Sequence, residues 1–424
     1  MLNYSFGKNS LESQLDALGI RVAFEKNLTK AVSYADAISA SNLPAFACQG
    51  SSAPDMAIMM AAAKRIKVGC SDFVLLGTGG SSLGAQAAFA LARYRQSVGI
   101  RFHTPDSLCP FEMDYLFSSL NPSGTHILVV SKSGSTAETL AQLLVFRAWL
   151  EASVGAENLA DHFTFITEPG ARPLRHYGEA LGALVLDHPA DIGGRFSVLT
   201  KVGMLPALVA GLSAKGFRDG AERVCSSFSD QPAQSAAVVG AVLIHTLHQY
   251  RGITQVLIMA YADILRAFTR WQGQLWAESL GKGGLGTTPI RAIGPVDQHS
   301  QMQLFLDGPN DKFCTIITVP SLNLGPRIDG ADSRAYGLDY MAGRTIGDMV
   351  TCESRATQDS LRLQGRMVRE IIIDSLSEAN LGGLFASFML ETVLTAHLMG
   401  VNAFDQPAVE QGKVFTRQYL SELA

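Results

Sequence analysis

The sequence has no uninterrupted apolar run long enough to cross a bilayer; its longest candidates, such as residues 202–212, are interrupted by Gly and Pro. The first residues lack a basic region followed by an apolar stretch, so a signal peptide is not predicted. Positive charge is not in excess either, with 34 Lys and Arg against 38 Asp and Glu and a formal net charge of -4. We therefore expect a soluble cytoplasmic protein with neither a membrane nor nucleic acid as a partner, although local basic pockets for small anions stay possible.

Cysteine is scarce and scattered. The six cysteines include no Cys-x-x-Cys pair and no neighbouring His at metal-ligand spacing; they are Cys48, Cys70, Cys109, Cys225, Cys314 and Cys352. This pattern argues against a disulfide framework and against a zinc site. We expect free thiols in a reducing compartment and no bound metal.

What the chain does contain is ample core material, with 47% apolar and 17% charged residues among 424. That length predicts two or more packed domains. Short β-branched runs alternate with longer helical patterns, which favours α/β architecture with parallel sheets covered on both faces. The expected strands are 73–76, 126–130, 162–166, 183–186, 255–259 and 313–319, and the expected helices are 85–94, 137–150, 236–250 and 262–280.

The amount of chain suggests two such doubly wound sheets, each in a three-layer α/β/α arrangement. Residues 1–45 are predicted to form an N-terminal helical arm. The division between the two domains is placed at the polar, Ser- and Gln-rich stretch 217–234. Ser135 followed by Glu138 fits a capping box at the start of the second expected helix.

Two of the expected strands end in loops rich in Gly and Ser. The first loop reads GTGGSSLG and contains Gly80 and Ser81; the second reads SKSGST and contains Ser131, Lys132, Ser133 and Thr136. Both loops open helices, and helix N-termini with Gly-exposed amides and nearby hydroxyls suit a phosphate. Each loop alone could be a simple tight turn, but two in successive units favour phosphate binding.

Two familiar phosphate-loop patterns are missing. The dinucleotide pattern G-x-G-x-x-G fails because Ser82 occupies its last position, and the ATP-binding pattern G-x-x-x-x-G-K-[ST] does not occur. A hydroxyl-rich site without that lysine suits a phosphate monoester better than a triphosphate.

Glu278 is a candidate general base. Residues 264, 268, 271 and 275 form an apolar stripe at helical spacing, and Glu278 continues it. Burial at such a seam would raise the pKa of a carboxyl towards the range useful for proton transfer. The pattern fits equally well a helix-end glutamate that pairs with Lys282.

Arg195 follows two glycines in GGRFSVLTKVGMLP, and its permanent charge could stabilise an oxyanion, or simply join two segments in a salt bridge. His299, in GPVDQHSQMQLFLDGP, is suited to proton transfer but by itself is more consistent with a structural role. Near the C-terminus, FDQPAVEQGK supplies Gln406 and Lys413.

Six segments together resemble the glucose-6-phosphate isomerase family. They are GTGGSSLG, SKSGSTAET, GGRFSVLTKVGMLP, QLWAESLGK, GPVDQHSQMQLFLDGP and FDQPAVEQGK, in the order of the family and spread over about residues 77–413. The resemblance implies two sugar-isomerase (SIS) domains, here expected at 46–216 and 235–395, and a C-terminal helical tail, 396–424. It also implies a homodimer with shared active sites and no cofactor.

The resemblance further implies residue roles. Gly80, Ser81, Ser131, Ser133 and Thr136 match the phosphate loops, with Lys132 in the same loop, and Gln406 matches a substrate contact. Glu278 matches the base that moves a proton between C1 and C2, and Arg195 the group that stabilises the enediolate. His299 matches a ring-opening residue supplied by the partner subunit, and Lys413 its ring-opening partner.

The implied reaction is reversible conversion of glucose 6-phosphate to fructose 6-phosphate through ring opening and a cis-enediol. A related isomerase that also accepts mannose 6-phosphate would share the same segments. A non-catalytic sugar-phosphate sensor is a third possibility, but residues 1–45 show no basic recognition helix, and a sensor needs no Glu278, Arg195 and His299 together.

Overall fold

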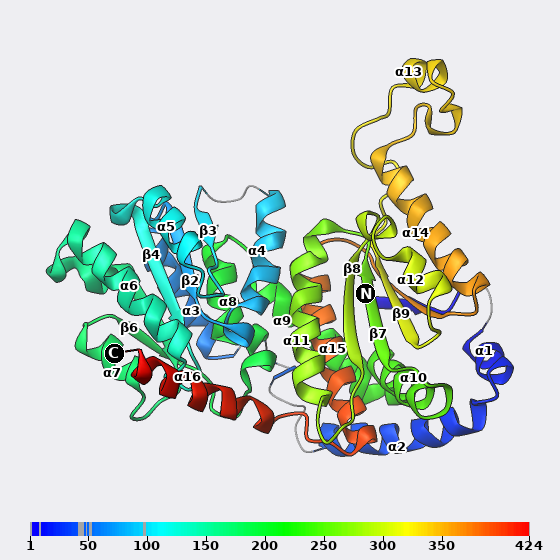
Figure 1. Cartoon of the computed structure of the whole chain (residues 1–424), viewed down its shortest axis with the longest axis horizontal. Coiled ribbons are helices and arrows are strands. Elements are labelled where there is room, and N and C mark those ends of the chain that lie inside the picture. Colours follow the sequence, from blue (N-terminus) through cyan, green and yellow to red (C-terminus); the bar gives the residue numbers. More distant parts are fainter. Residues whose placement is uncertain are drawn as a thin grey trace.

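The computed structural model describes residues 2–7, 10–40, 46–47, 49–50, 53–95 and 99–423, without the side chains of residues 94 and 95. The ten strands among these residues form two separate five-stranded sheets. The first sheet has the order β3-β2-β4-β5-β6 and the second the order β1-β10-β9-β7-β8. Figure 1 shows the sheets side by side, with helices around and between them.

All pairings in the first sheet are parallel. Those of the second sheet are parallel too, except that β1 joins β10 in antiparallel register. The strands of the first sheet are β2 (Asp72–Leu76), β3 (Arg101–His103), β4 (Thr125–Val130), β5 (Phe163–Thr167) and β6 (Leu184–Asp187). Those of the second are β1 (Leu2–Ser5), β7 (Gln255–Ala260), β8 (Thr288–Ile293), β9 (Lys312–Thr318) and β10 (Met367–Ile373).

The sheets are embedded in sixteen described α-helices. These are α1 (Leu11–Ala17), α2 (Arg21–Ala40), α3 (Asp55–Lys67), α4 (Leu83–Arg95), α5 (Pro110–Ser119), α6 (Ala137–Val154), α7 (Pro173–Ala180), α8 (Lys201–Val209), α9 (Ala214–Asp230), α10 (Ala236–Arg251), α11 (Arg266–Leu280), α12 (Met302–Asp307), α13 (Gly330–Ala335), α14 (Ile346–Leu363), α15 (Glu378–Met399) and α16 (Glu410–Glu422).

Each sheet is buried on both faces, as the apolar strand sequences predict. In β2, Phe73 and Leu75 belong to a core that includes side chains of α4 and α8. Val74 and Leu76 face a separate core under α5, α6 and α7. The second sheet alternates in the same way, with its other face covered by α12 and α14. The predicted α/β class with helices on both faces of parallel sheets is therefore confirmed.

One continuous core joins the two sheets. It contains apolar side chains of α3, α4, α8, α10, α11 and α15 together with inner-face side chains of both sheets. Figure 1 shows α9, α11 and α15 between the sheets. Helix α9, residues 214–230, covers most of the expected division at 217–234 and packs against α15. The predicted domain boundaries stay predictions.

Three details differ from the sequence-based expectations. Residues 2–5 form an edge strand rather than part of a helical arm. The capping box is wrong, because Thr136 is the N-cap of α6 and makes no side-chain capping bond. Cys70, Cys109, Cys314 and Cys352 are free thiols as expected, but Cys225 is disulfide-bonded, and Cys48 lies outside the described residues.

Among the described residues, α15 is the one helix whose length and apolar composition would fit a membrane span. Its most apolar window is 89% buried inside the protein, as in the central helix of a globular core.

A buried ion pair ties α15 to the second sheet. Arg369 of β10 donates from both terminal nitrogens to Glu391 of α15, at 2.7 and 3.0 Å, and also to Thr315 of β9 at 3.1 Å. Both charged side chains are almost fully buried, at 2% and 3% exposure. Gly240 of α10 leaves room for the pair, since a Cβ there would lie 2.1 Å from Arg369 Nη1.

We predict that Glu391→Gln lowers the free energy of unfolding by about 3–5 kcal/mol, because it leaves a buried guanidinium uncompensated. Glu25→Gln, which breaks the exposed Arg21–Glu25 pair on α2, is the matched control and should cost less than about 0.5 kcal/mol. Urea denaturation followed by circular dichroism measures both; equal stability of the two variants would contradict the structural role of the buried pair.

Candidate active site

Arg195 occupies the centre of the site, on the 3-10 helix η4 (Gly194–Leu199). Its Nε donates to Ser279 Oγ at 2.8 Å, and its Nη1 to Gln406 Oε1 at 3.0 Å. Its Nη2 donates to two carbonyls of the C-terminal segment, those of Ala403 at 2.6 Å and Asp405 at 3.0 Å. The side chain is only 3% exposed, so its charge is fixed in place with little access to water.

Burial lowers the pKa of Arg195 from its usual value, while the nearby Glu278 carboxylate acts in the opposite direction. The guanidinium nevertheless keeps its charge near neutral pH, because its reference pKa is far above that range. A fixed positive charge in a water-poor setting is well suited to stabilise negative charge on a reacting oxygen.

Glu278 lies beside this guanidinium, near the C-terminal end of α11. Its Oε2 is 3.5 Å from Arg195 Nη1 and accepts a hydrogen bond from Gln274 Nε2 at 3.2 Å. Three of the four residues of the predicted apolar stripe, Phe268, Trp271 and Leu275, are buried in the core, whereas Ile264 is partly buried and precedes α11. Glu278 itself is 28% exposed, so the carboxylate lies at the rim of the core, where a ligand can reach it.

The alternative pairing of Glu278 with Lys282 is not observed. Lys282 Nζ instead contacts Asp405 at 3.0 Å and donates to the carbonyls of Ser279, at 3.0 Å, and Asn402. The hydrogen bond from Lys282 lowers the pKa of the Asp405 carboxyl. Lys282 and Arg195 thus hold the C-terminal segment 402–406 against α11, which brings Gln406 to the site.

The first Gly-rich loop packs directly on the Arg195 segment. Gly79 has a positive φ of 54°, and a Cβ at Gly80 would come within 2.2 Å of the Gly194 carbonyl carbon and 2.4 Å of Arg195 N. Only glycine permits this approach of two backbones. Ser81 is partly exposed on the short 3-10 helix η1 (Gly79–Ser81). This helix lies next to Gln274, the hydrogen-bond partner of Glu278, because a Cβ at Gly79 would touch the Gln274 side chain.

The second loop follows β4, which is the parallel neighbour of β2. Both loops therefore lie at the carboxyl ends of adjacent strands of the first sheet. Ser131 Oγ and Thr136 Oγ1 are 2.9 Å apart, and Gly134 N donates to Ser131 Oγ at 3.2 Å. Ser133 Oγ accepts from the backbone and hydroxyl of Ser135. Because the Thr136 hydroxyl pairs with Ser131, it is not used to cap α6.

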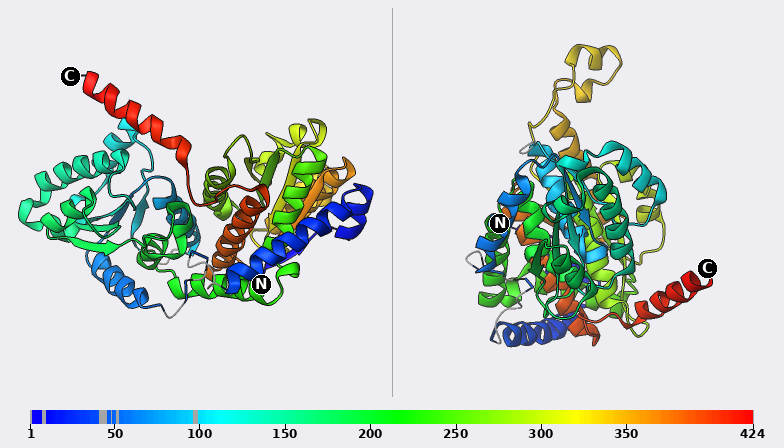
Figure 2. Two further views of the ribbon diagram at one scale, coloured as in Figure 1. Left: turned by 90° about the horizontal axis from the view of Figure 1, so that it is seen from below. Right: turned by 90° about the vertical axis from the view of Figure 1, so that its left-hand side faces the viewer.

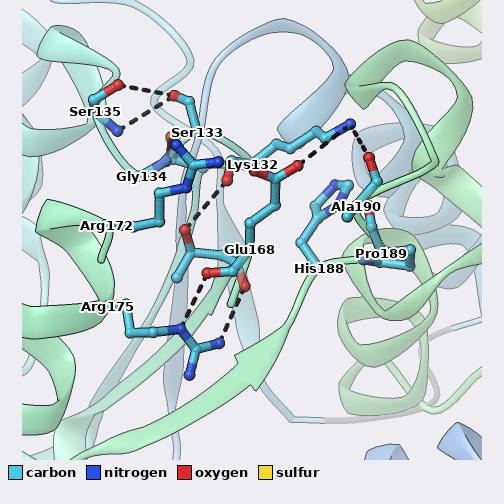
Figure 3. A network of polar contacts seen from close by, with 12 residues as sticks. Lys132, Ser133, Gly134, Ser135, Glu168, Arg172, Arg175, His188, Pro189 and Ala190 are labelled. Carbon is cyan, nitrogen blue, oxygen red and sulfur yellow. Dashed lines mark hydrogen bonds and ion pairs between the residues drawn. The ribbon is translucent and has the colours of Figure 1, made fainter. Parts of the chain in front are cut away.

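Lys132 leaves the second loop in another direction. Its Nζ donates to Ala190 O at 2.8 Å and lies 3.5 Å from Glu168 Oε1. Figure 3 shows this ammonium on the side of His188 and Ala190, away from the Ser133 and Ser135 hydroxyls.

His299 and Lys413 make no contact with the Arg195–Glu278 cluster among the described residues. His299 is exposed and follows the 3-10 helix η7 (Val296–Gln298). Lys413 is exposed on α16 and pairs with Glu410 at 2.7 Å. Figure 2 shows α16 projecting from the body of the molecule.

Sequence reasoning missed two residues of the cluster, Gln274 and Ser279. Gln274 precedes Glu278 by one helical turn, and that i, i+4 spacing is a signal that could have identified it. Its Oε1 is buried and has no hydrogen-bond partner in the structure. Ser279 follows Glu278 directly and orients Arg195, which the sequence alone does not reveal.

A cavity of about 1420 Å³ lies elsewhere, between the N-terminal segment, α10 and α14. Residues that line it include Phe6, Tyr250, Arg362 and Glu370, and none of the predicted site residues does. The site is instead recognised from its converging polar side chains. In the described part of the chain, no group of three or more His, Cys, Asp and Glu residues is placed to hold a metal ion.

Comparison with known proteins points to one family. The family described as "Phosphoglucose isomerase" matches residues 61–290. A glucose-6-phosphate isomerase of Rubrobacter xylanophilus is 39% identical over 354 residues, which cover 82% of each chain. A glucose-6-phosphate isomerase of Thermus thermophilus is 37% identical over 359 residues, covering 82% of this chain and 84% of that protein.

Solved structures share the fold. A hypothetical protein from Thermus thermophilus superposes with a TM-score of 0.86 at 33% identity, covering 99% of this chain and 100% of that one. A glucose-6-phosphate isomerase from Chlamydia trachomatis gives a TM-score of 0.79 at 20% identity, covering 100% of this chain and 89% of that one, which supports the fold alone.

We predict that Gly80→Ala lowers the free energy of unfolding by about 1–3 kcal/mol, because the added methyl group forces the first loop away from Arg195. The matched control is Gly193→Ala, where the nearest atom to a Cβ is Phe196 Cδ2 at an ordinary 3.7 Å. Thermal unfolding compares the two variants, and a crystal structure of Gly80→Ala should show a longer separation between the backbones of residue 80 and Gly194. If Gly80→Ala is as stable as Gly193→Ala, the two backbones do not touch.

Proposed function

The chain belongs to the phosphoglucose isomerase family and interconverts glucose 6-phosphate and fructose 6-phosphate, and we propose that the Arg195–Glu278 cluster is where it does so. The observation that carries this proposal is the 3.5 Å separation of Glu278 Oε2 and a guanidinium held by four hydrogen bonds. A base and an oxyanion-stabilising group lie side by side there, as proton abstraction next to a carbonyl requires.

In the proposed mechanism, Glu278 removes the proton from C2 of the open-chain aldose and returns it to C1, while a second proton passes from O2 to O1, so that the C1 carbonyl becomes a hydroxyl and the C2 hydroxyl a carbonyl. As that proton leaves, negative charge develops on the oxygens of the enediolate. Arg195 is prepared for this charge because its neighbours orient it before the substrate binds, so little reorganisation accompanies the reaction. The partial exposure of Glu278 supports this role, since the carboxylate must be reachable by the sugar.

The phosphate group is proposed to bind at the two Gly- and Ser-rich loops. Gly80 and Ser81 provide one side, and the hydroxyls of Ser131, Ser133 and Thr136 the other. The contact of Gly80 with Gly194 supports this arrangement, because it places the first loop directly behind the residue that carries the reactive guanidinium. Anchoring the distant phosphate orients C1 and C2. Gln406 is proposed to contact the sugar from the C-terminal segment.

Ring opening is proposed to use His299 and Lys413, with His299 supplied by the partner subunit of a homodimer. The exposure of His299 supports a role at a subunit interface.

Two projecting segments present exposed apolar side chains that a second copy could cover. Segment 319–345 carries Leu322, Leu324, Tyr336 and Tyr340, and α16 carries Val414, Phe415, Tyr419 and Leu420. A cytoplasmic location stays a prediction.

We predict that Glu278→Gln lowers kcat by roughly 10²–10⁴-fold, because the amide cannot accept the substrate proton. KM for fructose 6-phosphate should change little, since the phosphate loops are intact. A coupled assay that measures glucose 6-phosphate formation tests this, with exposed Glu112→Gln of α5 as the matched control. Turnover of the Glu278 variant close to that of the control would refute the proposal.

A mixing experiment tests the shared site. Glu278→Gln and His299→Leu should each be inactive alone. If His299 serves the partner's site, a refolded equimolar mixture should recover about one quarter of wild-type activity, because half of the dimers contain one intact site. A mixture as inactive as its components would show that Glu278 and His299 of the same subunit work together.

A further inference from the structure

Lys132 stands between two residues of the proposed phosphate site, Ser131 and Ser133, yet its side chain is engaged elsewhere. Its Nζ donates to Ala190 O at 2.8 Å and is 3.5 Å from Glu168 Oε1. Figure 3 shows both contacts on the side opposite the serine hydroxyls. If Lys132 were a phosphate ligand, its ammonium group should point towards the hydroxyls that bind the phosphate.

The acceptor of this hydrogen bond lies in the segment that leads to Arg195. Ala190 follows β6 and is separated from Arg195 by four residues, of which Ile192 is buried and Gly193 and Gly194 are flexible by nature. A backbone with two successive glycines needs external contacts to hold one conformation. Lys132 supplies one such contact at the start of that segment, and Gly80 supplies another at its end.

Lys132 is itself held by the loop after β5. Its carbonyl oxygen accepts hydrogen bonds from Glu168 N at 3.1 Å and from Thr167 Oγ1 at 3.3 Å. The Glu168 side chain is 12% exposed and lies between two cations, Lys132 and Arg172. Arg172 Nη2 donates to Glu168 Oε2 at 2.6 Å. The loops after β4, β5 and β6 are therefore joined through one lysine and one glutamate.

The surroundings of Lys132 keep this arrangement fixed. Arg175 donates to the carbonyl of Glu168 at 3.0 Å and also pairs with Asp187 at the end of β6. His188 is 1% exposed, and its Nδ1 is 2.8 Å from Pro189 O. Burial lowers the pKa of His188, which favours its uncharged form.

We propose that Lys132 is a positioning residue, which clamps the segment that carries Arg195 to the phosphate loop and is held in place by Glu168, rather than a ligand of the phosphate. This inference rests on the proposed function of Arg195 and extends it. As a consequence, the clamp fixes the position of the Arg195 guanidinium relative to the loop that binds the phosphate. Loss of the clamp should affect the chemical step more than binding.

The test is steady-state kinetics of Lys132→Met and Glu168→Gln, with inorganic phosphate as a competitive inhibitor that reports on the phosphate loop alone. We expect kcat to fall at least tenfold in both variants, while Ki for inorganic phosphate changes less than threefold. The double variant should be no slower than Lys132→Met, since both changes break one contact chain. Lys132→Arg, which can still donate to Ala190 and pair with Glu168, should recover most of kcat.

Arg172→Met is the matched control, because it removes the other cation on Glu168 without touching Ala190. Its kcat should stay within twofold of wild type. Circular dichroism and thermal unfolding establish whether each variant is folded. If Lys132→Met does not fold, Glu168→Gln tests the clamp independently.

Two results would overturn the clamp: kcat within threefold of wild type in either folded variant, or a tenfold rise in the phosphate Ki of Lys132→Met. Failure of the proposed function would look different. In that case Glu278→Gln would remain active, whereas failure of the clamp alone leaves Glu278→Gln inactive and Lys132→Met active.

Discussion

The burial of one guanidinium is the constraint on which the rest of this structure depends. Arg195 is withdrawn from water, and every hydrogen bond it donates goes to an element distant in sequence: α11, or the segment 403–406. A buried charge is tolerated only where such partners are present, because its desolvation costs several kcal/mol. The folding of α11, η4 and the C-terminal segment around Arg195 therefore assembles the site and satisfies the charge at the same time.

This constraint explains why two sheets are needed. Arg195 and the Gly-rich loops belong to the first sheet and its connections, whereas Glu278, Gln274 and Ser279 lie on α11, next to the second sheet. The shared core between the sheets fixes their relative position. Arg270 of α11 adds a polar link, since it donates to Gln86 and Asp106 of the first sheet's side, and Gln86 in turn donates to Ser82 of the first loop.

The sequence predicted the parts of this arrangement that follow from local patterns. Strands β2, β4, β5, β7 and β9 were found because burial on both faces produces apolar runs, and β6 was found from its short apolar run at 183–186. Strand β10 was missed because its charged residues, Arg369 and Glu370, interrupt the run; their partners Glu391, Thr318 and Gln358 are distant in sequence. Strands β1 and β3 were missed because four- and three-residue strands give too little pattern.

The site shows the same division. Arg195, Glu278 and Gln406 were identified from motifs, and the structure brings them together. The roles of Ser279 and Lys282 could not be predicted, because they depend on where the C-terminal segment returns to α11. His299 and Lys413 remain separate from the cluster in one chain, so their proposed roles depend on a second subunit or on a bound sugar.

A crystal structure with an open-chain sugar-acid phosphate, whose carboxylate resembles the enediolate, would test the central claim most directly. The account predicts the carboxylate within hydrogen-bonding distance of Arg195, its carbon chain against Glu278, and its phosphate among Ser81, Ser131, Ser133 and Thr136. A ligand bound with its phosphate elsewhere, or with Glu278 turned into solvent away from the carbon chain, would contradict it.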